Sequence, residues 1–301
     1  MPTIGRHVSR LSGYAPALPT PFDSQGNIDA PAFERLCDLQ IANGATALVV
    51  CGTTGEAPTL SPEEHKHLIR IAVAQARCRI PVIAGAGANA TANAIELTRD
   101  AEAAGADAVL SVVPYYNKPT QAGLYAHFRA VIESTSLPLI LYDVPSRTAC
   151  GLANETVARL AELPRVIGLK DAAGDATRPA RLRSLVGTNF TLLCGDDAIA
   201  LPYFAQGGDG CISVTSNVAP RLCAEFQAAC LRGNFAAALK LQDKLTPLHI
   251  NLFVETSPAP IKYALSLLGK CANTLRLPMV PASEKAQVTV RQAMVHAGLI
   301  N

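Results

Sequence analysis

The sequence predicts an α/β protein, a (β/α)8 TIM barrel with a C-terminal helical appendage. Short apolar runs alternate with longer segments of helical periodicity eight times within about 225 residues, and eight strand-helix units are the number that closes such a barrel. After Asn217 the alternation stops and only helical patterns follow. Apolar residues make up 49% of the 301 positions, which is enough to fill a large core and excludes a disordered chain.

The eight predicted strands are short and rich in Val, Ile and Leu, as expected of strands that are buried on both faces. They span residues 13–18, 45–50, 80–84, 106–113, 138–142, 166–170, 191–194 and 210–214. Between them apolar side chains recur three or four positions apart, for example at Leu68, Ile71 and Ala72. This spacing predicts amphipathic helices that cover the sheet.

Two segments carry signals for the start of a helix. Ser61 and Glu64 form a capping box, with Pro62 at the first helical position. Asn154 is expected to cap the helix that ends near Leu163.

Four helical patterns close the chain, at residues 220–232, 235–245, 258–268 and 284–296. The first of them would be the eighth helix of the barrel, and the other three lie beyond it. We therefore predict a catalytic barrel domain at residues 1–232 and a C-terminal helical domain at residues 233–301.

An open, doubly wound sheet is the alternative fold, because residues 85–90 match the G-x-G-x-x-A pattern of dinucleotide-binding turns. That reading also requires an acidic residue at the end of the next strand. The next strand instead runs through Val113 into Pro114 and Tyr115, without an acid. A tight turn between a strand and a helix is the preferred interpretation of the glycines.

The charge pattern excludes several classes of partner. Lys and Arg outnumber Asp and Glu by 26 to 24, and no basic run exists, so a nucleic-acid binder is not indicated. The sequence contains no run of about 18 apolar residues, so no membrane span is predicted. Residues 1–10 lack the apolar core of a secretory signal, so no such signal is predicted. Nine cysteines without a C-x-x-C pair indicate reduced thiols. We expect a cytoplasmic protein whose partners are small molecules or copies of itself.

No metal site is predicted. All six histidines, at positions 7, 65, 67, 127, 249 and 296, fall outside the predicted strand ends. Asp196 and Asp197 are adjacent carboxylates, but no other ligand-type residues converge on them in the predicted fold.

Lys170 is the strongest candidate for catalysis. Active sites of such barrels lie at the carboxyl ends of the strands, and Lys170 directly follows the apolar run of the sixth strand. The other seven lysines fall in helices or loops with polar neighbours. Burial at a strand end disfavours the ammonium form and favours a nucleophilic amine, which forms Schiff bases with carbonyl substrates. The alternative is a structural lysine paired with Asp171.

Other strand ends offer complementary groups. Thr53 and Thr54, in a glycine-flanked loop after the second strand, can hold a carboxylate through hydroxyls and free amides. Tyr142 ends the fifth strand and shares the barrel mouth with Lys170, where it can transfer protons. Arg147 offers a planar fork for a second carboxylate. The structural alternatives are a simple turn for the loop of Thr53 and Thr54, a half-buried aromatic for Tyr142 and a surface ion pair for Arg147.

Taken together, these motifs resemble those of the dihydrodipicolinate synthase family, within the class I aldolase and pyruvate-lyase superfamily. The resemblance runs nearly end to end, from Pro19 to Pro278. The motifs that carry it are Gly52-Thr53-Thr54-Gly55-Glu56, Pro114-Tyr115-Tyr116-Asn117-Lys118-Pro119, Tyr142-Asp143-Val144-Pro145-Ser146-Arg147-Thr148, Gly168-Leu169-Lys170-Asp171 and Gly195-Asp196-Asp197.

The resemblance implies a lyase that condenses pyruvate with L-aspartate 4-semialdehyde without a cofactor, an entry step of lysine and diaminopimelate synthesis. In that family pattern Lys170 is the Schiff-base lysine. Tyr142, Thr53 and Tyr116 form the proton relay, and Tyr116 reaches the site of a neighbouring subunit in a homotetramer of two tight dimers.

The family pattern also assigns binding residues. Thr54 helps to hold the pyruvate carboxylate, Arg147 receives the carboxylate of the semialdehyde, and Gly195 and Ile212 line the pocket.

The resemblance extends to an allosteric lysine pocket, which matches His65, Asn89 and Tyr115. The acidic residue that family members place four positions after the asparagine is Asn93 here.

Two positions depart from the common family pattern. Asp143 stands where Asn is frequent, and Asp171 begins an Asp-Ala-Ala run where Glu-Ala-Thr is common. A pyruvate-type aldolase or dehydratase that acts on sugar acids is the alternative within the superfamily. A catalytically inactive barrel that only binds a metabolite is the alternative outside it.

Overall fold

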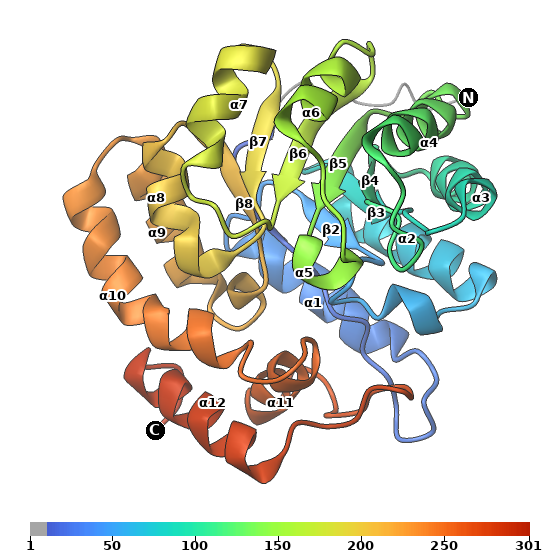
Figure 1. Ribbon diagram of the computed structural model, residues 1–301. Helices are drawn as coiled ribbons and strands as arrows, with labels where there is room; N and C mark the ends of the chain where they lie inside the picture. Colours follow the sequence, from blue (N-terminus) through green and yellow to red (C-terminus); the bar gives the residue numbers. More distant parts are fainter. Residues whose placement is uncertain (1–10) are drawn as a thin grey trace.

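The protein is a closed barrel of parallel strands, surrounded by helices (Figure 1). The structure, a computed structural model, describes residues 11–301. The strands are β1 (Gly13–Pro16), β2 (Leu48–Val50), β3 (Val82–Gly85), β4 (Ala108–Val112), β5 (Leu139–Asp143), β6 (Val166–Asp171), β7 (Thr191–Cys194) and β8 (Gly210–Ser213). All eight predicted strands are confirmed, with ends that differ by at most three residues.

The strand order β1-β8-β7-β6-β5-β4-β3-β2 brings the first two strands to the ends of one eight-stranded sheet. The barrel closes between them through a parallel bridge of Ala17 with Val49, where the amide of Leu18 donates to the carbonyl of Val49 over 2.9 Å. The TIM-barrel fold is therefore confirmed, and the open doubly wound sheet is wrong.

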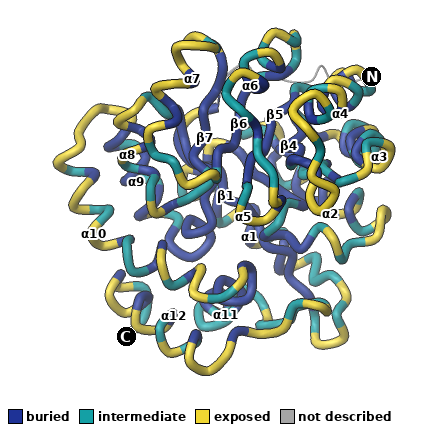
Figure 2. The backbone as a smooth tube through the Cα atoms, viewed as in Figure 1, coloured by how far each residue is buried: buried dark blue, intermediate teal, exposed yellow. Residues whose placement is uncertain are grey.

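Helices cover the outside of the barrel and leave its strands buried (Figure 2). Each connection between consecutive strands carries at least one helix. These helices are α1 (Ala30–Ala42), α2 (Pro62–Ala76), α3 (Thr91–Ala103), α4 (Gln121–Glu133), the short α5 (Pro145–Thr148), α6 (Asn154–Ala161), α7 (Arg178–Val186) and α8 (Ala200–Ala205), and α9 (Pro220–Leu231) follows the last strand.

The two predicted helix starts have different outcomes. The Ser61 hydroxyl accepts from the amide of Glu64, and the Glu64 carboxylate accepts from the amide of Ser61, so the capping box of α2 is confirmed. The prediction for Asn154 is wrong, because Ala153 precedes α6 and no side chain caps that helix. The side-chain oxygen of Asn154 accepts instead from Nε of Arg178, over 3.0 Å.

Three further helices, α10 (Phe235–Asn251), α11 (Ala259–Leu267) and α12 (Glu284–His296), make up the C-terminal part, with α11 and α12 below the barrel in Figure 1. The prediction that the first of them ends at Leu245 is wrong. The helix continues through Pro247 because the buried side chains of Leu248 and His249 hold its last turns against the protein. Proline removes one backbone hydrogen bond, and tertiary packing can offset that loss.

A buried polar cluster joins the C-terminal part to the loop after β2. Lys262 of α11 forms an ion pair with Glu56, and both side chains are at most 2% exposed. The ammonium of Lys262 also donates to the carbonyl of Thr274 over 2.8 Å and lies 4.1 Å from the ring centre of Phe22. Arg276 stacks on the same ring at 4.3 Å. We call this group the junction cluster.

Close backbone approach explains the glycine pattern of residues 85–90. A Cβ on Gly85 would lie 2.2 Å from the carbonyl oxygen of Cys51, and one on Gly87 would lie 2.3 Å from the amide nitrogen of Val112. Neither position admits a side chain, because real Cβ atoms do not approach backbone so closely. The packing of neighbouring strand ends thus accounts for both glycines, as the turn interpretation predicts.

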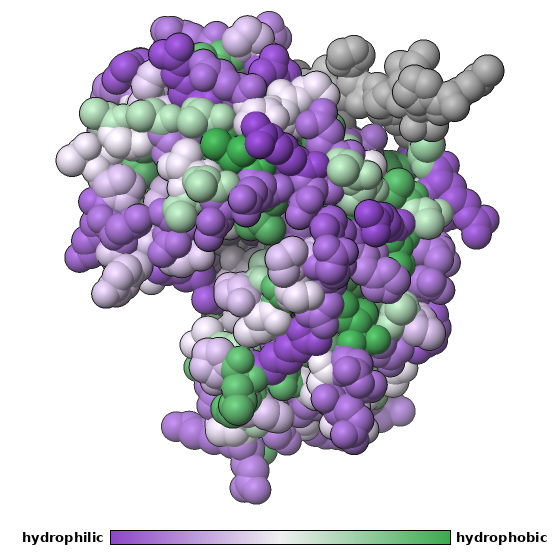
Figure 3. All heavy atoms as spheres, turned by 90° about the vertical axis from the view of Figure 1, so that its right-hand side faces the viewer, coloured by the Kyte–Doolittle hydropathy of each residue, from purple (hydrophilic) through white to green (hydrophobic). Residues whose placement is uncertain are grey.

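The surface is mainly hydrophilic, with apolar residues in small groups on the face that Figure 3 shows. Among residues 11–301, no helix combines the length and the apolar character needed to span a bilayer. All nine cysteines are free, as predicted. Six of them are buried, whereas Cys78 is exposed. His7 and the segment examined for a signal lie outside the described residues.

Candidate active site

The strand register places Lys170 and Tyr142 side by side at the mouth of the barrel. Tyr142 of β5 pairs with Lys170 of β6, and Lys170 pairs in turn with Leu193 of β7. Side chains of paired residues on parallel strands point to the same face, so these three project together. They belong to the last residues of their strands, which is the end where barrels of this kind carry out chemistry.

Lys170 is buried but has no anionic partner. The side chain is 6% exposed, and its amine lies 4.2 Å from the centre of the Tyr142 ring. Within the described part of the chain, no hydrogen bond or ion pair is formed by this amine. The expected alternative, a pair of Lys170 with Asp171, is wrong, because Asp171 lies on the opposite face of β6 and pairs with Arg178.

Gly195 leaves space beside the amine. A Cβ at this position would lie 3.1 Å from Cε of Lys170, so any larger residue would press on the lysine side chain. Ile212 of β8 is buried two residues beyond Gly210, the partner of Leu193. Because strand side chains alternate, Ile212 points to the same side of the sheet as Lys170.

An open cleft of about 740 Å³ leads to this end of the barrel. Its lining includes Tyr142, Arg147 and Gly195, together with His249 and Ile250 of α10 and residues 253–257 after that helix. Arg147 lies in α5 and is exposed, so its guanidinium is available to a ligand in the cleft. The structure therefore brings together Lys170, Tyr142, Gly195 and Arg147.

The loop after β2 is rigidly held. The hydroxyl of Thr20 donates to the carbonyl of Gly55 over 2.7 Å, and the carboxylate of Glu56 accepts from the amide of Arg276 over 3.1 Å. Thr54 is buried and Thr53 is partly buried. The structure shows neither threonine hydroxyl in contact with Lys170 or Tyr142.

The loop after β4, in contrast, carries an exposed side chain at a strained backbone position. Tyr116 is 88% exposed and has a φ of 74°, in the left-handed region that non-glycine residues rarely adopt. Tyr115 is 37% exposed, and Asn117 donates from its side chain to the carbonyl of Asn89 over 2.8 Å. Tyr116 is thus not brought to Lys170 of its own chain.

The residues of the predicted lysine pocket lie around the turn after β3. Nε2 of His65 lies 2.7 Å from the carbonyl oxygen of Gly85, in the turn that contains Asn89. Burial lowers the pKa of His65, so the neutral ring is favoured. Asn93 is exposed on the first turn of α3.

Three buried groups near the mouth make contacts that the sequence patterns do not predict. His249 lines the cleft from α10, with Nδ1 2.8 Å from the Thr215 hydroxyl. The carboxylate of Asp197 accepts hydrogen bonds from the Ser213 hydroxyl and from the amides of Val214 and Thr215. Arg178 lies behind β5 and β6. His249 and Arg178 do not follow a strand of the predicted fold in a recognisable motif, whereas Asp197 belongs to the Gly195-Asp196-Asp197 motif after the seventh strand.

In the described residues, no three His, Cys, Asp or Glu side chains are placed to hold a metal ion together.

Comparisons with known proteins converge on one family. Residues 10–297 match the family model of the dihydrodipicolinate synthetase family. A 4-hydroxy-tetrahydrodipicolinate synthase from Afipia carboxidovorans is 56% identical over 293 residues, which cover 97% of this chain and 99% of the relative.

Solved structures agree with this assignment. A chloride-inhibited dihydrodipicolinate synthase from Acinetobacter baumannii in complex with pyruvate superposes with a TM-score of 0.94 at 44% identity, over 96% of this chain and 99% of the other. A monomeric dihydrodipicolinate synthase variant superposes with a TM-score of 0.94 at 42% identity, over 96% of this chain and 98% of the other. The chain therefore belongs to the dihydrodipicolinate synthetase family.

Proposed function

We propose that the protein is a lyase of the class I aldolase type that condenses pyruvate with L-aspartate 4-semialdehyde, the 4-hydroxy-tetrahydrodipicolinate synthase activity of lysine and diaminopimelate biosynthesis. The observation that carries this proposal is the buried amine of Lys170, which has no carboxylate partner among the described residues and lies 4.2 Å from the ring centre of Tyr142, a residue that lines the open cleft. The relatives matched over nearly the whole chain bear that activity as their name.

In the proposed reaction, the Lys170 amine adds to the keto carbon of pyruvate, and water leaves as the C–N double bond forms. Loss of a methyl proton then gives an enamine. The enamine carbon attacks the aldehyde carbon of the second substrate, and the amino group of that substrate finally displaces the lysine. Tyr142 moves protons in these steps, a role that the 4.2 Å distance between its ring centre and the amine supports.

The two substrate carboxylates have different proposed sites. Thr54 helps to hold the pyruvate carboxylate, in a loop that is fixed by Thr20 and Glu56. Arg147 binds the carboxylate of the semialdehyde, because its exposed guanidinium lines the same cleft as Tyr142. Gly195 and Ile212 shape the pocket beside the lysine. These side chains account for every step, so the proposed reaction needs no cofactor.

Tyr116 supports a shared site between subunits. Within a single chain, nothing explains why an aromatic side chain is 88% exposed at a strained backbone position. We propose that it completes the proton relay with Thr53 and Tyr142 in a neighbouring subunit, within a cytoplasmic homotetramer built from two tight dimers.

The test is reductive trapping. Incubation with pyruvate and borohydride, followed by peptide mass mapping, is expected to show one pyruvate-derived adduct, on Lys170. Addition of aspartate semialdehyde is then expected to turn over pyruvate. An adduct on another lysine with Lys170 unmodified would overturn the mechanism, whereas an adduct without turnover, or turnover only with a sugar-acid aldehyde, would overturn the assigned acceptor.

A further inference from the structure

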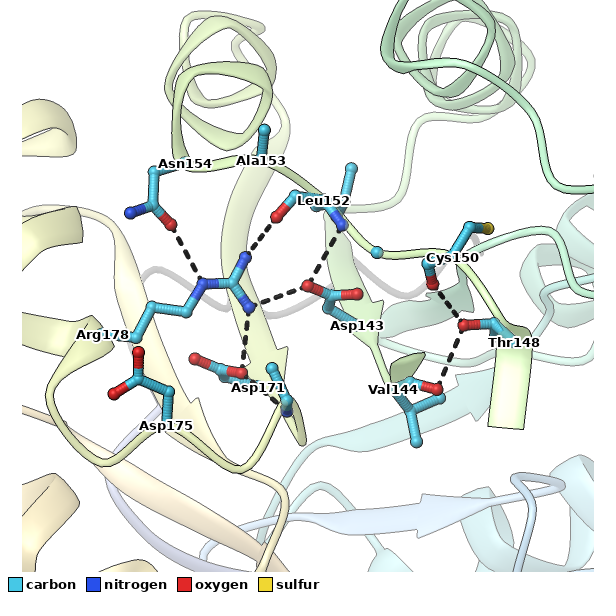
Figure 4. Close-up of polar contacts among 12 residues, drawn as sticks. Asp143, Val144, Thr148, Cys150, Leu152, Ala153, Asn154, Asp171, Asp175 and Arg178 are labelled. Carbon is cyan, nitrogen blue, oxygen red and sulfur yellow. Dashed lines mark hydrogen bonds and ion pairs between the residues drawn. The ribbon is translucent and has the colours of Figure 1, made fainter. Parts of the chain in front are cut away.

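A buried guanidinium lies directly behind the two strand ends that carry Tyr142 and Lys170 (Figure 4). Arg178 begins α7, and its side chain is 6% exposed. It donates four hydrogen bonds: from Nη1 to Asp143 over 2.8 Å and to Asp171 over 3.1 Å, from Nη2 to the carbonyl of Leu152 over 2.6 Å, and from Nε to Asn154 over 3.0 Å.

Both carboxylates are next in the chain to a residue of the proposed site. Asp143 follows Tyr142, Asp171 follows Lys170, and the strand register pairs each aspartate with the other. Side chains alternate along a strand, so the aspartates point outward where the tyrosine and the lysine point inward. Arg178 therefore bridges β5 and β6 at the point from which the reactive side chains leave the sheet.

The same guanidinium also holds the chain that returns from α5. Its contacts with Leu152 and Asn154 fix this segment, and the amide of Leu152 donates to the Asp143 carboxylate over 3.2 Å. Arg147 lies in α5, only a few residues before it. One side chain thus connects the tyrosine strand, the lysine strand and the arginine loop.

A purely structural role for Arg178, Asp143 and Asp171 would be costly, because all three charged side chains are buried. Asp143 and Asp171 are at most 2% exposed, and each has one carboxylate oxygen without a hydrogen-bond partner. Burial raises the pKa of both carboxyls, against the opposing effect of Arg178. Buried ion pairs are weak stabilisers of a fold, but a forked guanidinium fixes geometry well. Asp143 and Asp171 are also the two positions that depart from the common family pattern.

We propose that Arg178 is a positioning residue, which sets Lys170, Tyr142 and the loop of Arg147 relative to one another. This inference rests on the proposed function for the identity of the two substrates. It assigns a role to a residue that touches neither of them.

The test compares Arg178→Lys with Arg181→Lys, a matched control on the same helix whose side chain is half exposed. A lysine at position 178 keeps the charge but cannot reach four acceptors at once. We expect kcat to fall by about 10- to 100-fold, as for a displacement of catalytic groups by roughly 1 Å. The KM for aspartate semialdehyde is expected to rise several-fold, and the KM for pyruvate to stay within about twofold, because the loop after β2 is held independently. The control is expected to match the parent protein.

Two results would overturn the proposal. One is an Arg178→Lys protein with unchanged kcat and KM. The other is a lower kcat with both KM values unchanged and a folded fraction, measured by circular dichroism, that falls in proportion. If Arg178→Lys does not fold, Asp171→Asn gives a second test. This variant keeps the shape but removes the charge that orients Arg178 at β6, and a rate of borohydride trapping at Lys170 equal to that of the parent would then overturn the proposal.

The outcome is separable from that of the proposed function. If the parent protein traps pyruvate but does not use aspartate semialdehyde, the assigned acceptor is wrong. The ratio of trapping rates between Arg178→Lys and the parent still tests the positioning role.

Discussion

Two lysines of this protein are buried beside an aromatic ring, yet their surroundings differ in one decisive respect. Lys170 lies at the barrel mouth, 4.2 Å from the Tyr142 ring, and no carboxylate neutralises it. Lys262 lies in the junction cluster, 4.1 Å from the Phe22 ring, and it is paired with Glu56 and bonded to the carbonyl of Thr274. Burial alone therefore does not mark a reactive amine.

We interpret this difference as one between the proposed catalytic lysine and a structural one. Lys262 donates to fixed acceptors, and an amine that is held in this way cannot approach a carbonyl carbon. Lys170 has no such acceptor among the described residues, so in the proposed reaction its amine is free to add to a carbonyl carbon. A lysine of the first kind holds the C-terminal helices on the barrel, and one of the second kind is free to react.

The sharpest test of this comparison is Lys170→Ala beside Lys262→Met. Lys170→Ala is expected to abolish both the pyruvate adduct and the condensation, because no other lysine among residues 11–301 is buried without an ion pair or hydrogen-bond acceptor. Folded Lys262→Met is expected to keep the adduct on Lys170. Mass mapping after borohydride reduction measures both. An adduct on Lys262 in Lys170→Ala, or no adduct on Lys170 in folded Lys262→Met, contradicts the distinction.

Tyr116→Phe tests whether the mouth is complete in one chain. We expect the pyruvate adduct to persist and the condensation rate to fall by about 10²- to 10⁴-fold, the usual contribution of a proton-transfer group. Mixing this variant with Lys170→Ala under conditions of subunit exchange is expected to restore part of the activity, since some sites would then hold both residues. If exchange is demonstrated and activity does not return, the site is not shared.

Removing one partner of the buried pair at the junction is expected to destabilise the fold. Lys262→Met leaves the Glu56 carboxylate buried without a counter-charge, which costs about 3–5 kcal/mol in comparable pairs. Urea unfolding measures this loss. The double variant Lys262→Met/Glu56→Gln is expected to recover much of it, and a double variant no more stable than Lys262→Met would show that the pair does more than neutralise charge.

Inhibition by L-lysine is expected to be weak. Asn93 stands where the family pocket has an acid, and replacing a carboxylate by an amide loses a charge-assisted bond of about 1.5–3 kcal/mol, or one to two powers of ten in affinity. Glu56 does not compensate, because Lys262 and Arg276 hold its carboxylate. The inhibition curve at saturating pyruvate decides, and half-inhibition well below about 1 mM would show an intact pocket.

The ion pair between Glu64 and Arg276, next to the junction cluster, is expected to make a small contribution to the free energy of unfolding that is lost in acid. Hydrogen bonds from Arg276 lower the pKa of Glu64 from 4.5 to about 2. Because the pKa of Glu64 is lower in the folded than in the unfolded protein, its carboxylate stabilises the fold. This contribution is fully present at a pH above the unfolded-state pKa and is lost as the pH falls toward 2. We expect Glu64→Gln to cost roughly 1–2 kcal/mol at pH 7 and progressively less below pH 4. A pH-independent difference between the two proteins would contradict this origin.

Most of the barrel was predictable because its signals are local. Each strand is an apolar run that is buried on both faces, and the capping box at Ser61 lies within four residues. Lys170 and Tyr142 were accessible for the same reason, since strand-end positions follow from the fold. Helix α10 was cut short in the prediction because Pro247 is a local stop signal, whereas the packing that overrides it comes from residues distant in the sequence.

The contacts that organise the site were not predictable from pattern. Asn154 carries a normal capping signal, but Arg178, 24 residues later, takes its side chain. Lys262 looks like an ordinary helical lysine until the fold places it on Glu56, more than 200 residues earlier. Such pairs depend on tertiary distance, which no local spacing encodes.

The exposed thiol of Cys78 makes the protein easy to label at a single point. Thiolates are the reactive form of cysteine, and burial raises the pKa of Cys271 to about 11 and raises that of Cys150, so the partly exposed thiols react slowly. Cys78 follows α2 and precedes β3, at the end of the barrel opposite Lys170. A maleimide dye would therefore mark each chain once without touching the mouth, and two batches dyed in different colours would report the mixing of subunits by energy transfer.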